Sequence, residues 1–82
     1  LWPLAGAAQD FPALYDVTGV AADDVLNVRA TPDASGAILT TLPPRATDIE
    51  VIRVTGPGAD AWGWIGLPEG NGWVAMRFLA RQ

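Results

Sequence analysis

Short stretches in which apolar and polar residues alternate recur along the chain, and none shows the 3.6-residue period of a helix. The alternation predicts strands at residues 13–17, 25–29, 37–42, 49–54 and 61–67, and one further strand around Val74. Clusters of Gly and Pro separate these segments, which is typical of short strands joined by tight turns. The sequence therefore predicts an all-β domain of five to six short antiparallel strands, folded into a small, highly curved barrel.

In two segments, the apolar positions predict which side chains face the core. In residues 37–42, Ile38 and Leu42 are predicted to share a face. Residues 49–54 conflict internally, because Val51 and Val54 cannot both face the core of a regular strand. A β-bulge, or burial of the strand on both faces, would reconcile the two positions.

The C-terminal hairpin holds three of the four tryptophans and is the predicted working surface. If Ile65 faces the core, Trp62 and Trp64 share the outer side of their strand. An inward Val74 likewise places Trp73 on the outer side of the next strand. Exposed indoles offer flat apolar faces with N–H donors, which suit sugars and peptides. The alternative for either indole alone is that it closes an open end of the barrel beneath a loop.

Composition and charge narrow the possible functions. Eighty-two residues make one domain, and 50% hydrophobic residues with 17% charged ones exclude a disordered chain. A net charge of −4, with no Lys and scattered Arg, argues against nucleic acid and against an anchor on anionic lipid. The absence of Cys and His removes disulfides, thiol nucleophiles and the usual zinc ligands.

Residues 1–10 are apolar, then rich in small residues, then abruptly polar. Ala5-Gly6-Ala7 fits the small-x-small rule of a signal peptidase site, so this segment is predicted to be a signal-peptide remnant. The alternative is an ordinary flexible N-terminal tail. The apolar run is too short to span a membrane, and we expect no membrane insertion.

Four motifs, in order along residues 13–79, resemble the bacterial SH3-like domains of the SH3b family. Leu26-Asn27-Val28-Arg29, followed by Ala30 and Pro32, resembles the L-N-V-R-x-x-P signature. The segments I-L-T-T-L-P (38–43), W-G-W-I (62–65) and G-W-V with F-L (72–74 and 78–79) are similar to the strands that follow it. The resemblance implies an SH3b-like domain over residues 11–82.

Two positions depart from the family pattern, and a second resemblance is weaker. Pro43-Pro44-Arg45-Ala46 stands where the family usually has Gly after Pro, and Phe78 stands where Tyr is common. The A-L-Y-D run at residues 13–16 resembles the opening of eukaryotic SH3 domains. The Pro and Tyr of their groove for Pro-rich peptides have no counterpart at residues 75–78, so such a groove is not expected.

Catalytic chemistry has little support. Ser35 is the only serine and lies in a Ser-Gly turn, while Asp23 and Asp24 are adjacent and point to opposite faces of an extended chain. We expect no enzyme activity, no metal and no cofactor. Arg29 is predicted to pair with a carboxylate such as Asp33 or Asp16.

The resemblance implies a non-catalytic binding module, exported to the periplasm or secreted by a bacterium. The expected partner is a cell-wall peptide or glycan, or a protein. The ligand-binding residues expected are Trp62, Trp64 and Trp73, flanked by Tyr15 and Phe78. The alternative is a structural domain that docks a protein, or dimerises, through the C-terminal hairpin. The expected state is a monomer or a weak homodimer.

Overall fold

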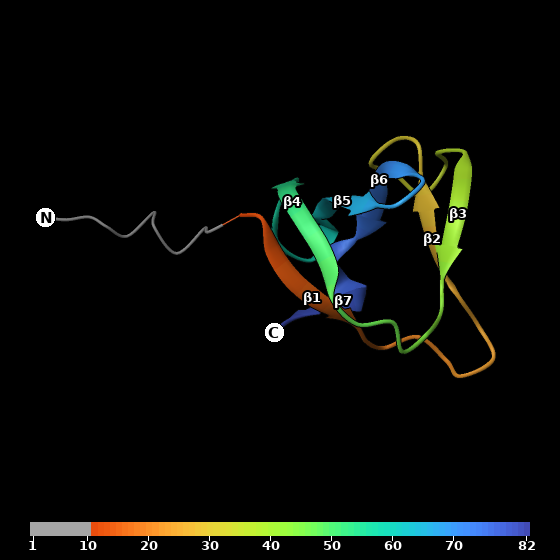
Figure 1. Cartoon of the computed structure of the whole chain (residues 1–82). Helices are drawn as coiled ribbons and strands as arrows, with labels where there is room; N and C mark the ends of the chain where they lie inside the picture. Colours follow the sequence, from red (N-terminus) through yellow and green to blue (C-terminus); the bar gives the residue numbers. More distant parts are fainter. Residues whose placement is uncertain (1–10) are drawn as a thin grey trace, which may run out of the picture.

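The computed structural model describes residues 11–82, and the segment predicted to be a signal remnant or tail lies outside them (Figure 1). The strands are β1 (Ala13–Val17), β2 (Leu26–Arg29), β3 (Ile38–Leu42), β4 (Ile49–Thr55), β5 (Trp62–Leu67), β6 (Gly70–Ala75) and β7 (Leu79–Arg81). Within residues 11–82, η2 (Gly58–Asp60) and η3 (Met76–Phe78) are single-turn 3-10 helices. The all-β prediction is confirmed for the described part of the chain.

The seven strands of the described residues belong to one antiparallel sheet, in the order β3-β2-β6-β5-β4-β1-β7. Figure 1 shows β1, β4 and β7 on one side of the domain and β2 and β3 on the other. The strand beyond the predicted five to six is β7. It has three residues and pairs with β1, bringing Leu79 opposite Val17. Such a short strand is specified by its distant partner rather than by its own pattern.

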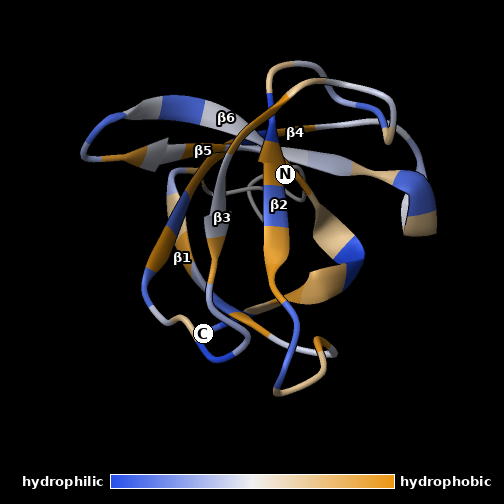
Figure 2. Cartoon of the chain, turned by 90° about the vertical axis from the view of Figure 1, so that its right-hand side faces the viewer, coloured by the Kyte–Doolittle hydropathy of each residue, from blue (hydrophilic) through white to orange (hydrophobic). Residues whose placement is uncertain are grey.

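Every strand contributes at least one buried side chain to a single core. The alternation on β2 follows the prediction, because Leu26 and Val28 are buried while Asn27 and Arg29 are half-buried. Figure 2 shows the alternation of hydrophobic and hydrophilic residues along this strand. The core consists of Tyr15, Val17, Leu26, Val28, Leu42, Ile49, Val51, Ile65, Val74 and Leu79. Burial of these apolar surfaces, at about 25 cal/mol per Å², is the main stabilising term.

A β-bulge resolves the conflicting pattern of β4. Val51 pairs with Ile65 of β5, but the next pair joins Arg53 to Trp64, so β4 carries one extra residue there. The shift changes the phase of the strand, and Val54 packs against the core from the same side as Val51. Of the two explanations that the sequence left open, the structure shows the β-bulge.

The prediction that Ile38 and Leu42 of β3 share a face is wrong, because a second bulge lies between them. The pairing of Val28 with Thr40 is followed by Arg29 with Ile38, so the extra residue is Leu39. Because a one-residue slip moves a side chain to the other face, Ile38 does not share the buried side of Leu42. Ile38 is 53% exposed and Leu39 is 55% exposed on this edge strand.

The turn in which Pro43 and Pro44 replace the family's Gly closes without glycine. The Ala46 N–H donates to the Pro43 carbonyl at 3.2 Å, and the Val17 N–H donates to the Ala46 carbonyl at 2.8 Å. The left-handed backbone of this connection falls at Asp48, where φ is 58°. The Asp48 N–H donates to Asp16 Oδ1 at 3.2 Å, which holds the connection against β1.

Candidate functional site

Trp62 lies at the start of β5 with its indole on the outer side of the sheet. It pairs with Thr55 of β4 and Ala75 of β6, and both neighbours are small. The opposite side of β5 is buried at Gly63 and Ile65. The indole is therefore half-buried on a face where the adjacent strands leave room beside it, as the alternation predicted.

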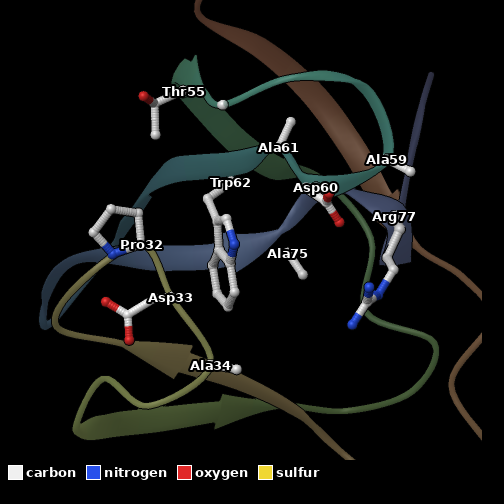
Figure 3. A pocket seen from close by; sticks show the side chains of 11 residues that line it. Pro32, Asp33, Ala34, Thr55, Ala59, Asp60, Ala61, Trp62, Ala75 and Arg77 are labelled. Carbon is white, nitrogen blue, oxygen red and sulfur yellow. The ribbon is translucent and has the colours of Figure 1, made fainter.

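A cavity of about 430 Å³ opens beside this indole, and Figure 3 shows its walls. One wall is Pro32, Asp33 and Ala34 from the β2–β3 loop, and the other is the turn from Thr55 to Ala61 with Arg77 of η3. The Trp62 ring stands between the two walls in Figure 3. Three segments far apart in the sequence thus meet around one aromatic side chain.

A smaller cavity of about 150 Å³ adjoins the first. The two share four lining residues, Ala34, Trp62, Ala75 and Arg77. The smaller one adds Val25, Leu26, Asn27, Arg29 and Phe78. We name the continuous depression formed by the residues that line both cavities the Trp62 groove.

Hydrogen bonds within the β2–β3 loop shape its side of the groove. The prediction that Arg29 pairs with Asp33 or Asp16 is wrong, because Arg29 Nη1 donates to the Gly36 carbonyl at 2.8 Å. Asp33 Oδ1 accepts from the Ser35 N–H at 2.9 Å and from Ser35 Oγ at 2.7 Å. Ser35 is therefore a turn former, as its Ser-Gly context predicted.

Hydrogen bonds hold the pKa of Asp33 below its usual value of 3.8. The largest effect comes from Ser35 and the next from Thr31. Because the folded pKa is lowered, the loop is stabilised fully above pH 3.8, and this contribution is lost as the pH falls through the folded value. We expect the Ser35 amide signal, followed by NMR, to titrate with a midpoint below 3.8. Asp33→Asn should abolish that titration, and a midpoint at or above the usual value would contradict the assignment.

Trp64 and Trp73 form a separate aromatic cluster on the same face. Their ring centroids are 4.9 Å apart with planes tilted by 50°, a stabilising geometry for an aromatic pair. The Arg53 guanidinium lies 6.0 Å from the Trp64 ring centroid and 5.6 Å from that of Trp73. Neither indole lines the Trp62 groove, and each is covered in part by the other and by Arg53.

The five predicted ligand-binding residues are thus divided by the structure. Trp62 and Phe78 line the groove, whereas Trp64 and Trp73 stack on each other. Tyr15 is 8% exposed and packs in the core, so it offers a ligand little surface. In the L-N-V-R motif, the two apolar side chains are buried and the two polar ones line the smaller cavity.

The sequence patterns did not single out Pro32, Asp60, Ala75 or Arg77 as groove residues. No local pattern marks these positions, because each belongs to a turn or strand end that acquires its role only by meeting the others. Among the described residues, no three His, Cys, Asp or Glu side chains lie together as metal ligands would. None of the helices in residues 11–82 is long and apolar enough to cross a membrane.

Comparison of the chain with models of protein families, with curated proteins and with solved structures found no match. The geometry of the Trp62 groove is therefore the basis for a functional proposal.

Proposed function

We propose that residues 11–82 are a non-catalytic binding module of the bacterial SH3-like type, which takes short cell-wall peptides in the Trp62 groove outside the cytoplasm. One observation carries this proposal. The half-buried indole of Trp62 is shared by two adjoining cavities of about 430 and 150 Å³. The size of the larger cavity is typical of sites for small ligands.

The lining of the groove combines an apolar floor with a few polar groups at its rim. Trp62 and Ala75 supply the floor, and Phe78 extends it into the smaller cavity. Asp33, Asp60 and Arg77 stand at the rim and are exposed. An aromatic surface with charged edges suits a peptide, whose backbone and side chains need both kinds of contact.

The SH3-like assignment is supported by where the motif residues lie. Asn27 and Arg29 of the L-N-V-R motif flank the groove, while its apolar residues anchor β2 in the core. The motif thus connects the fold to the proposed binding surface. Export to the periplasm or the cell exterior follows from a cell-wall ligand, since such peptides are presented there.

The composition of the groove supports binding rather than catalysis. Among its described lining residues, the only hydroxyl group belongs to Thr55. Nucleophilic catalysis requires an activating base within hydrogen-bond reach of such a group. Asp33, the acid whose pKa is lowered, is engaged with Ser35 in its own loop.

Trp62→Ala is expected to weaken the binding of a peptidoglycan-derived tetrapeptide about tenfold, equivalent to about 1.4 kcal/mol. The reason is that the indole is the one aromatic side chain that lines both described cavities. Heteronuclear NMR titration measures both the dissociation constant and the residues that shift. Trp64→Ala is the matched control, because it removes the same side chain from the same strand outside the groove.

Two results would overturn the proposal. One is the absence of shifts around Trp62 with peptidoglycan fragments at millimolar concentration. The other is a homodimer that buries Trp62, seen by sedimentation at several protein concentrations, which would favour docking through the C-terminal hairpin.

A further inference from the structure

We infer that the Trp62 groove selects short peptides with two free ends, seating the ammonium group in the larger cavity and the carboxylate in the smaller one. This inference rests on the proposed function and adds the ligand's charge and orientation. The distribution of charge along the groove carries it.

The larger cavity is lined by two acidic residues, Asp33 and Asp60, and by Arg77, which it shares with the smaller cavity. Asp33 projects from the β2–β3 loop and Asp60 from the end of η2, and both residues are exposed (Figure 3). The hydrogen bonds from Ser35 favour the charged form of Asp33. Two carboxylates from opposite walls would attract a cationic group placed between them.

Among the described residues that line the smaller cavity, two are arginines and none is acidic. Arg29 uses Nη1 on the Gly36 carbonyl, which leaves other N–H groups of the same guanidinium available. The Arg77 guanidinium lies 5.3 Å from the ring centroid of Phe78, which restricts it beside the groove. Within residues 11–82, neither arginine is neutralised by an ion pair. A planar guanidinium is well suited to a carboxylate.

Of the four residues that the two cavities share, Ala34, Trp62 and Ala75 are apolar and Arg77 is charged. Trp62 and Ala75 belong to both cavities, and Val25 and Phe78 line the smaller one. A peptide that places its carboxylate at the arginines would therefore set its last side chain against Val25 and Phe78. The structure assigns an apolar residue to the C-terminal position of the ligand.

The probe is the tripeptide Ala-Ala-Leu, compared with its N-acetylated and its C-amidated forms by NMR titration. Each modification removes one charge, and we expect each to weaken binding to the unaltered domain about fivefold, the upper range for exposed charge pairs. In Asp60→Asn the penalty for acetylation should fall below about twofold, while the penalty for amidation persists. In Arg77→Gln the penalty for amidation should fall below about twofold, while the penalty for acetylation persists.

Matched controls are Glu69→Gln and Arg45→Gln, which remove exposed charges of the same sign outside the groove. Both should bind the three peptides as the unaltered domain does. Thermal unfolding of all four variants checks that the fold is retained.

The outcomes separate the inference from the proposed function. Equal binding of all three peptides, or the opposite assignment of the two penalties, would overturn the inference and leave the peptide groove in place. Binding of a peptidoglycan tetrapeptide without binding of Ala-Ala-Leu would also overturn it. Failure of every peptide to bind would contradict both the inference and the proposed function.

Discussion

Replacing Ile65 by alanine is expected to lower the free energy of unfolding by about 2–5 kcal/mol. Ile65 is 0% exposed in the middle of β5. Its neighbours across the sheet are Val51 on β4 and Gly72 on β6. A glycine has no side chain to fill the cavity, and a β-branched valine has few alternative rotamers. Because domains of this kind are stable by only about 5–15 kcal/mol, the loss is a large fraction of the total.

Denaturant unfolding followed by tryptophan fluorescence measures this loss. The midpoint should fall while the dependence on denaturant concentration stays the same. Ile38→Ala is the matched control, since it removes the same atoms from a side chain that is 53% exposed. It should cost less than about 1 kcal/mol. Similar losses for the two variants would contradict the placement of Ile38 on the exposed side of β3.

Gly72→Ala is expected to destabilise the domain by about 1–3 kcal/mol, although alanine is only one methyl group larger. Gly72 is buried on β6 where β2 crosses it. A Cβ atom there would overlap Val28 Cγ1 and come within 3.4 Å of the Arg29 carbonyl oxygen. Val28 is 1% exposed, so neither its stiff side chain nor the β2 backbone can move aside without disturbing the core.

Gly63→Ala is the control for this prediction, again measured by denaturant unfolding. Gly63 is also buried, but its added Cβ would meet the sulfur of Met76, a flexible and half-buried side chain. Met76 can adopt another rotamer, so the cost should be below about 1 kcal/mol. Equal costs at the two glycines would mean that β2 does not cross β6 as closely as the structure shows.

Alternation predicted β1, β2, β4 and β5 to within a residue or two, because the period of a strand is a local property of the chain. The bulge in β4 was also accessible from the sequence as one of two explanations, because Val51 and Val54 cannot face the same side of a regular strand. The bulge in β3 was not accessible from the sequence. Ile38 and Leu39 are both apolar, and the pattern gave no reason to move either of them out of the core.

The candidate site was only partly predictable for a related reason. The outward direction of Trp62 follows from the inward direction of Ile65 on the same strand. Whether an outward indole borders an open cavity or a neighbouring ring depends on residues far away in the chain. Trp62 meets Ala75 and the β2–β3 loop, whereas Trp64 meets Trp73 and Arg53.

The sequence by itself determined the all-β class, most strand positions and the side of the sheet on which the tryptophans of the C-terminal hairpin lie. These depend on the two-residue period of a strand and on turn residues, which act over a few positions. Only the tertiary structure decided the edge position of β3, the pairing of β7 with β1 and the joining of two cavities at Trp62. Each of these requires contacts between distant segments, and such contacts are set by how the whole sheet bends to bury its core.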